Sequence, residues 1–304
     1  MIYTVTLNPS VDYFMKVNCS QLSDVNRITE YSFVAAGKGI NCAKILDVMG
    51  MESVAVYFSG GVTGDFIDSE IKKFKYIHSE PIHIEGLTRV NVKVYGSVDN
   101  AFNPTGPFID EYSKAKMLET FDKLQENDMV IISGSFPKGV DKRFVKEMCR
   151  KITAKKAKVV LDVSNFTLED YDGLDIFLIK PNKDELKDIL GVAEISDNEF
   201  HDCFKKLAEA GVQNMLLSLG KDGAYYEGSY GRYKMGTPKV KVVKSIGAGD
   251  SMLAAFVGTL IQTDDIELSL RMASATGTAI VSCESIPTME YINEVAEKIT
   301  VARV

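Results

Sequence analysis

The chain has 304 residues, 45% of them hydrophobic, which is enough to bury the core of one large domain, with or without an appendage. The formal net charge is −7 and no long basic run occurs, which argues against nucleic acid and anionic membranes as partners. The apolar runs are too short to span a membrane. Five scattered cysteines without a C-x-x-C pair predict reduced thiols and a cytoplasmic location. The three histidines lack metal-ligand spacing and a nucleophile partner, so we expect neither a zinc site nor a histidine-based triad.

The first part of the chain combines a core strand with short alternating segments. Residues 2–7 read as the core strand, and Asp12 lies just past its carboxyl end, where open α/β sheets bind ligands. Alternation of polar and apolar residues predicts a small accessory sheet from residues 14–17, 28–34 and 82–98. We expect this sheet to be an insertion, or lid, of roughly 11–34 and 82–106, within one domain that spans residues 1–304.

A glycine-rich turn at residues 36–41 opens a helix that continues to about residue 49. The turn is not a Walker A loop, because Lys38 is followed by Gly39 rather than by Ser or Thr. It also lacks the third glycine of a dinucleotide fingerprint. The turn still offers a cation, an amide and free backbone N–H groups at one helix start. Considered alone, it is better explained as a plain connection between a strand and a helix.

The middle of the chain repeats a strand and a helix several times. Strands are predicted at residues 53–58, 129–133, 159–163, 177–179 and 215–219, and helices at 65–74, 113–126, 141–155 and 197–210. Two short strands at 224–226 and 230–235 follow, and helices at 265–283 and 288–300 come last. This alternation predicts a mostly parallel sheet that is covered by helices on both faces.

The stretch from Ser245 to Met252 carries the strongest indication of chemistry. A predicted strand at residues 239–243 precedes it, and an apolar helix follows. Because Gly247 and Gly249 have no side chains, a phosphate or a developing negative charge can approach the N–H groups of the first helical turn. A carboxylate at Asp250 is unexpected at an anion site, unless it is a base that takes a proton from an attacking hydroxyl. A glycine-rich turn with Asp250 as an ordinary helix cap explains the stretch equally well.

Polar or glycine-rich groups follow several of the predicted strands, so one edge of the sheet should gather them. Among them, Asn182 and Glu185 place an amide and a carboxylate one helical turn apart. These hard oxygen ligands suit Mg²⁺, bound directly or through water. Considered alone, the pair is better explained as a helix cap with a surface glutamate.

Eight short motifs occur in a fixed order along the chain. They are Thr6-Leu-Asn-Pro-Ser-Val-Asp12, Val25-Asn-Arg27, Gly37-Lys-Gly-Ile-Asn41, Thr88-Arg-Val-Asn-Val-Lys93, Ser133-Gly-Ser-Phe-Pro137, Lys180-Pro-Asn-Lys-Asp-Glu185, Ser218-Leu-Gly220 and Gly247-Ala-Gly-Asp250. Their order and spacing resemble the ribokinase-like (PfkB-type) carbohydrate kinases over essentially the whole chain. Within that family, the chain is most similar to bacterial 1-phosphofructokinases and tagatose-6-phosphate kinases.

The resemblance implies a three-layer α/β/α sandwich with a mostly parallel sheet and a β lid, and a homodimer formed through the lid. It implies that ATP and Mg²⁺ are used to phosphorylate a ketohexose phosphate. D-fructose 1-phosphate, converted to fructose 1,6-bisphosphate, is the first choice of substrate, because the residues after Arg89 look more like those of the 1-phosphofructokinases. Two alternatives are a tagatose-6-phosphate kinase and a catalytically silent protein that binds a sugar phosphate.

The resemblance also implies roles for individual residues. Asp250 matches the catalytic base, and Gly247, Ala248 and Gly249 match the anion hole. The residues that match the sugar-phosphate site are Asp12, Arg27, Gly37, Lys38, Gly39, Asn41, Arg89 and Ser135, with Arg27, Lys38 and Arg89 facing the phosphate that the substrate already carries. The residues that match the ATP site are Lys180, Asn182, Ser218, Gly220 and Gly223. Asn182 and Glu185 match the motif that governs Mg²⁺, which is expected to bind through water.

Overall fold

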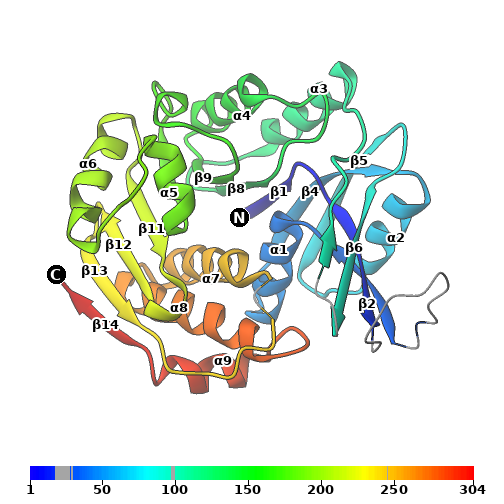
Figure 1. The fold of residues 1–304 in the computed structure, drawn as a ribbon. Coiled ribbons are helices and arrows are strands. Elements are labelled where there is room, and N and C mark those ends of the chain that lie inside the picture. Colours follow the sequence, from blue (N-terminus) through cyan, green and yellow to red (C-terminus); the bar gives the residue numbers. More distant parts are fainter. Residues whose placement is uncertain (18–27, 29, 97–99, 245) are drawn as a thin grey trace.

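The computed structural model describes residues 1–17, 28, 30–96, 100–244 and 246–304 (Figure 1). Within these residues, ten strands form one large sheet and four form a separate small sheet. In spatial order, the large sheet consists of β14 (Thr300–Arg303), β13 (Gly231–Gly236), β12 (Ala224–Gly228), β11 (Asn214–Ser218), β10 (Ile176–Ile179), β9 (Lys158–Val163), β8 (Met129–Gly134), β1 (Ile2–Thr6), β4 (Ser53–Gly60) and β5 (Ile77–Ile84). The small sheet consists of β3 (Tyr31–Ala36), β2 (Ser10–Val17), β6 (Arg89–Gly96) and β7 (Asn100–Phe102).

The strands from β11 to β5 are all parallel to their neighbours, whereas β12, β13 and β14 add an antiparallel edge. The carboxyl ends of the parallel strands therefore meet along one edge of the sheet, as their alternation with helices predicted. Ser135, Asn182 and Ser218, which the sequence predicted for the site, follow or end strands at this edge, whereas Asp12 and Arg89 lie in β2 and β6 of the small sheet.

Helices cover both faces of the large sheet, which confirms the predicted three-layer α/β/α class (Figure 1). The helices are α1 (Lys38–Val48), α2 (Gly61–Ile71), α3 (Glu111–Thr120), α4 (Lys142–Ala154), α5 (Lys183–Leu190), α6 (Phe200–Glu209), α7 (Ala248–Thr263), α8 (Ile266–Ser282) and α9 (Met289–Ala296). Short 3₁₀ turns occur at Phe121–Lys123, Leu168–Asp170, Asp197–Glu199 and Gly220–Asp222.

Alternate residues of a strand point to opposite faces of the sheet and so supply separate cores, as the period of two in a β-strand requires. In β8, Val130 and Ile132 belong to the core beneath α3 to α6, whereas Met129 and Ile131 belong to the core beneath α1, α7 and α8. Helix α7 is buried almost throughout, from Asp250 to Leu260, because α1 and α8 pack on either side of it. This burial fixes the first turn of α7 against the sheet.

Three elements differ from the sequence-based predictions. Residues 82–84 were expected in the small sheet, but they end β5 and pair with β4 in the large sheet. Residues 239–243 alternate like a strand but are assigned to no strand; instead the Val243 N–H donates to the Val281 carbonyl of α8. The helix predicted to reach residue 300 ends at Ala296, and β14 then pairs with β13.

Candidate active site

Helices α1 and α7 both begin at the carboxyl edge of the sheet, each directly after a glycine. Gly37 precedes α1 with φ +136°, and Gly247 precedes α7 with φ +83°, which is a conformation that favours glycine. Among the described residues, no side chain caps either helix. The first-turn N–H groups of α7, on Ala248 and Gly249, are therefore available to an anion from solution.

Asp250 lies in the first turn of α7 and is 8% exposed. Its Oδ2 accepts a hydrogen bond of 2.8 Å from Asn41 Nδ2, so the carboxylate links α7 to α1. Burial, and secondly the negative charge of Asp162, raise the pKa of Asp250 to about 6, although the Asn41 hydrogen bond and two lysines oppose the shift. A carboxylate with this pKa is ionised at neutral pH and can accept a proton from a hydroxyl.

Asp162, near the carboxyl end of β9, belongs to the site although the sequence analysis gave it no role. It is buried, and its two oxygens lie 3.2 Å from Lys38 Nζ and 3.7 Å from Lys180 Nζ. Burial alone would lower the pKa of Lys38, but the carboxylates of Asp162, Asp250 and Glu185 outweigh burial and raise it. The available signal was a charged residue within an otherwise apolar strand, Lys158-Val-Val-Leu-Asp-Val163, one position before the strand ends.

Two glycines of the site allow close approach of other groups. A Cβ on Gly249 would lie 2.9 Å from Lys180 Nζ, so glycine at this position leaves room for the Lys180 ammonium beside the α7 N-terminus. A Cβ on Gly39 would lie 2.5 Å from Thr6 Oγ1 and 2.9 Å from the Val5 carbonyl oxygen, so Gly39 brings α1 against β1. Gly39 was predicted to lie in the sugar site, and in this structure its backbone contacts β1.

The small sheet supplies a second buried carboxylate, Asp12. Its Oδ1 accepts hydrogen bonds from Ser10 Oγ at 2.9 Å and Asn91 Nδ2 at 2.8 Å. Its Oδ2 lies 2.5 Å from Lys93 Nζ, within a pair that is almost fully buried. Asp12 was predicted to lie in the site, but no role was predicted for Lys93, which lies 81 positions further along the chain.

Arg89 lies at the start of β6, and its guanidinium joins two backbone segments. Its Nη2 donates to the Asn8 carbonyl at 3.0 Å and its Nη1 donates to the Pro104 carbonyl at 3.1 Å. The Asn8 side chain donates in turn to the Thr105 carbonyl and to Ser135 Oγ, both at 3.1 Å. Arg89 and Ser135, both predicted for the sugar-phosphate site, are thus linked by hydrogen bonds through Asn8. The two hydrogen bonds of Arg89 also attach the small sheet to these backbone segments. Arg27 lies outside the described residues.

The residues selected for ATP and Mg²⁺ lie around the start of α5. Asn182 and Glu185 form a reciprocal capping box: Asn182 Oδ1 accepts from the Glu185 N–H, and Glu185 Oε2 accepts from the Asn182 N–H, both at 2.8 Å. Asn182 also forms a β-bridge with Ser218, which ends β11. Gly220 and Gly223, with φ of +60° and +92°, form the turn that follows.

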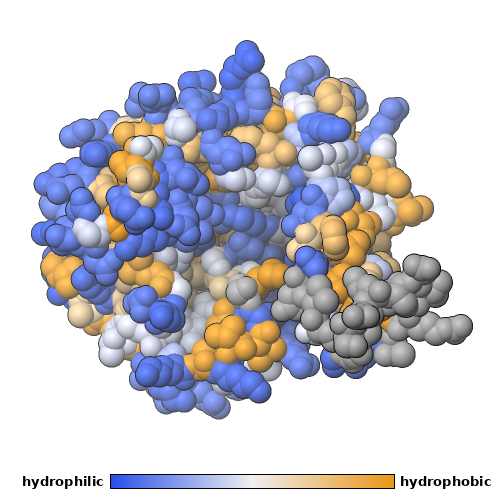
Figure 2. All heavy atoms as spheres, viewed as in Figure 1, coloured by the Kyte–Doolittle hydropathy of each residue, from blue (hydrophilic) through white to orange (hydrophobic). Residues whose placement is uncertain are grey.

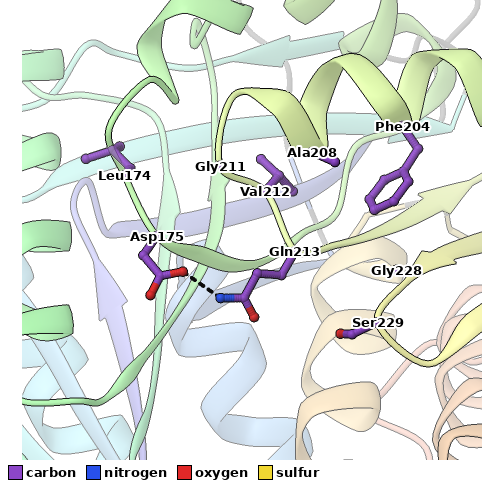
Figure 3. A pocket seen from close by; sticks show the side chains of 9 residues that line it. All are labelled: Leu174, Asp175, Phe204, Ala208, Gly211, Val212, Gln213, Gly228 and Ser229. Atoms are coloured by element: carbon purple, nitrogen blue, oxygen red, sulfur yellow. Dashed lines mark hydrogen bonds between the residues drawn. The ribbon is translucent and has the colours of Figure 1, made fainter.

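A hollow lined by hydrophilic residues lies at the centre of the face in Figure 2, between the side that carries α5 and the side that carries β2 and β6. A separate pocket lies at the opposite edge of the sheet, before the amino ends of β10 and β11 (Figure 3). Its lining includes Asp175 and Gln213, joined by a hydrogen bond of 2.5 Å, and Phe204. The selected site residues do not line this second pocket.

Residues 5–289 match the family model of pfkB family carbohydrate kinases, and the chain belongs to that family. The chain is 33% identical over the full length of both chains to the 1-phosphofructokinase of Bacillus subtilis (strain 168). It is 31% identical to the D-tagatose-1-phosphate kinase of Bacillus licheniformis, over 99% of each. A crystal structure described as a candidate phosphofructokinase from Staphylococcus aureus matches with a TM-score of 0.87 and 32% identity, covering 100% of this chain and 99% of the other.

These comparisons confirm the predicted family and class of enzyme, a kinase that uses ATP to phosphorylate a sugar phosphate. Within the described residues, no helix is long and apolar enough to cross a membrane.

Proposed function

We propose that this protein uses ATP to phosphorylate a ketohexose 1-phosphate, with D-fructose 1-phosphate as substrate and fructose 1,6-bisphosphate as product. The observation that carries the proposal is the buried Asp250 carboxylate beside the uncapped N-terminus of α7 and the Lys180 ammonium. A base and an anion cradle at one helix start match what phosphoryl transfer to a hydroxyl requires.

In the proposed reaction, Asp250 accepts the proton of the sugar hydroxyl as the hydroxyl oxygen attacks the γ-phosphorus of ATP. The bond from this phosphorus to the bridging oxygen of ADP breaks, and ADP leaves with the bonding electrons. The N–H groups of Ala248 and Gly249, together with Lys180, stabilise the negative charge of the transferring group. Asn41 holds the Asp250 carboxylate in place through their hydrogen bond.

Asp12 and the turn from Gly37 to Asn41 would hold the sugar hydroxyls, at the border between the small sheet and α1. Arg89 and Arg27 would face the phosphate that the substrate already carries, because cations form the strongest hydrogen bonds to phosphate. Lys38, also expected to face that phosphate, instead pairs with Asp162 near Lys180 and Asp250, so it would lie at the end where the phosphoryl group is transferred. The Arg89 guanidinium already donates to the Asn8 and Pro104 carbonyls. A phosphate bound there would share the guanidinium with these two backbone carbonyls.

The nucleotide would lie over the turn from Ser218 to Gly223 and the start of α5, with its phosphates directed at Lys180 and α7. The hard oxygens of Glu185 and Asn182 fit Mg²⁺, although the capping box already uses one of the two Glu185 oxygens and the single side-chain oxygen of Asn182. Within the described residues, no group of three or more His, Cys, Asp or Glu side chains could hold a metal. This donor set suits a Mg²⁺ held mainly by water and nucleotide phosphates, where it would neutralise phosphate charge.

The small sheet would act as a lid and as the interface of a homodimer. Two aromatic side chains on adjacent lid strands, Tyr13 and Phe33, stack at 4.4 Å, and Phe33 is half exposed beside the exposed Tyr31. Such aromatic surface supports a protein–protein contact.

The described cysteines are free thiols, which supports a cytoplasmic location.

The test is ADP release measured across a panel of sugars with the purified protein. The panel contains D-fructose 1-phosphate, D-tagatose 1-phosphate, fructose 6-phosphate, tagatose 6-phosphate and the unphosphorylated ketohexoses. We expect the highest kcat/KM with fructose 1-phosphate. D-tagatose 1-phosphate is the second candidate, because the relative named for it is 31% identical over nearly the whole chain. A preference for a 6-phosphate would contradict the proposed substrate, and ADP release with none of them would favour the silent sugar-phosphate-binding protein.

A further inference from the structure

The small sheet buries one ion pair within its own strands. Lys93 on β6 and Asp12 on β2 are 14% and 7% exposed, and the two charged groups lie 2.5 Å apart. Strands β2 and β6 are parallel, with Asp12 opposite Asn91, so Lys93 lies two residues further along the same face. The Lys93 ammonium also lies 5.3 Å from the centre of the Phe14 ring, which packs on that face.

The remaining contacts of Asp12 fix its orientation. Ser10 and Asn91 both donate to its Oδ1, so the Asn91 amide must direct its nitrogen towards the carboxylate. The Asn91 oxygen is then buried and, among the described residues, has no hydrogen-bond partner. The hydrogen bonds from Ser10 and Asn91, together with the Lys93 ion pair, hold the Asp12 carboxylate in one orientation.

Another lysine of the same sheet shows how unusual this pair is. Lys16 on β2 pairs with Glu30 at 3.0 Å, but the two side chains are 36% and 56% exposed. Water and salt screen such a surface pair, which contributes little. The Lys93–Asp12 pair is shielded from water, so removing the ammonium would leave a buried carboxylate without its counter-charge.

We infer that Lys93 is a positioning residue that neutralises Asp12, so that a carboxylate can hold the sugar beside the phosphate of the substrate. The inference rests on the function proposed above. A carboxylate is a strong acceptor for sugar hydroxyls, but its charge repels a dianionic phosphate in the same pocket. Lys93 cancels that repulsion and fixes Asp12 in place. A pocket for an unphosphorylated sugar would not require the counter-charge.

The test compares the kinetics of Lys93→Met with those of the wild-type protein on its best sugar phosphate. We expect KM for the sugar phosphate to rise on the order of 10- to 100-fold, with kcat and the KM for ATP within a few fold of wild type. Lys93→Arg keeps the charge and should recover most of the affinity. The matched control, Lys16→Met, removes an exposed lysine of the same sheet and should leave KM unchanged.

Two outcomes would overturn the inference while the proposed function stands. One is a KM for Lys93→Met within threefold of wild type. The other is a loss of kcat equal to the rise in KM, together with a lower melting temperature, which would make Lys93 a structural residue of the lid. Calorimetric titration with D-fructose 1-phosphate separates the two proposals, because Lys93→Met should weaken binding even if no phosphoryl transfer is detected. A wild-type protein that neither binds nor phosphorylates a sugar phosphate would overturn both.

Discussion

Two buried carboxylates flank the proposed site, and their surroundings differ. Asp250 lies at the start of a helix, accepts a hydrogen bond from the neutral Asn41 amide, and is near the negative Asp162. Asp12 lies in the small sheet, where it contacts the Lys93 ammonium and accepts two further hydrogen bonds from neutral side chains. Charges of both signs therefore act on Asp250, because the Lys38 and Lys180 ammonium groups are also near it, whereas the charge that contacts Asp12 is the Lys93 ammonium.

This difference indicates what each group can do. Burial, and secondly the charge of Asp162, outweigh the two lysines and raise the pKa of Asp250 to about 6, so this carboxylate can exchange a proton near neutral pH. The Lys93 ammonium and two neutral donors instead hold Asp12 in place as a hydrogen-bond acceptor. We therefore expect Asp250 to transfer the proton and Asp12 to orient the sugar, and the following substitutions test this division of roles.

The largest effect is expected for Asp250→Asn, which keeps the shape of the side chain but cannot accept the hydroxyl proton. We expect kcat to fall on the order of 10²- to 10⁴-fold while the affinities for sugar and ATP are largely retained. Steady-state kinetics and calorimetric titration measure the two quantities separately. Turnover within a few fold of wild type would remove Asp250 from the mechanism.

Asp12→Asn should give the converse result. The substitution removes the charge that Lys93 balances and weakens the acceptor for the sugar, so KM for the sugar phosphate should rise on the order of 10- to 100-fold. The rate constant kcat should change much less than in Asp250→Asn. If Asp12→Asn instead lowers kcat as much as Asp250→Asn does, the division of roles between the two carboxylates is wrong.

Gly249→Ala tests the contact between Lys180 and the N-terminus of α7. Because the added Cβ would lie 2.9 Å from Lys180 Nζ, the ammonium must move away, and we expect kcat to fall on the order of tenfold. Gly277→Ala in α8 is the control, because its Cβ would meet neighbours only at ordinary distances of 3.4 Å or more. Equal activities of the two variants would contradict a role for Lys180 at this helix start.

The smallest effect is expected for Glu185→Gln. Glutamine also fits a capping box, so the substitution removes the charge while the start of α5 stays capped. We expect a several-fold higher Mg²⁺ concentration for half-maximal rate and a modest loss of kcat. The control is Asp184→Asn, an exposed carboxylate in the same helical turn. An unchanged Mg²⁺ dependence would leave Glu185 with its capping role alone.

Much of the fold was predictable, because it depends on local patterns. The alternation of strands and helices correctly predicted the parallel sheet and its two helical layers. The glycines before α1 and α7 marked the helix starts that meet at the carboxyl edge. These features depend on periodicity and on backbone conformations that favour glycine, which a short stretch of sequence records.

The remaining features depend on contacts between distant segments. The sequence around Asp162 indicates no role, because the two lysines that pair with it come from other segments, the start of α1 and the residue after β10. The partner of Asp12 comes from a strand 81 positions away. Residues 239–243 alternate like a strand, but Val243 instead donates its N–H to the carboxyl-terminal part of α8. Alternation of polar and apolar residues indicates which side chains are buried, but it does not indicate which backbone segment the residues will pair with.

The pH dependence of kcat/KM for the sugar phosphate tests the central claim most directly, because it reports the ionisation of the base in the free enzyme. The base must be deprotonated to accept the hydroxyl proton, so raising the pKa of Asp250 to about 6 moves the acid limb upward. We expect kcat/KM to reach half of its plateau value near pH 6 and to fall about tenfold for each further pH unit below that point. A kcat/KM that stays constant down to about pH 5, with the protein still folded, would contradict the assignment of Asp250 as the base.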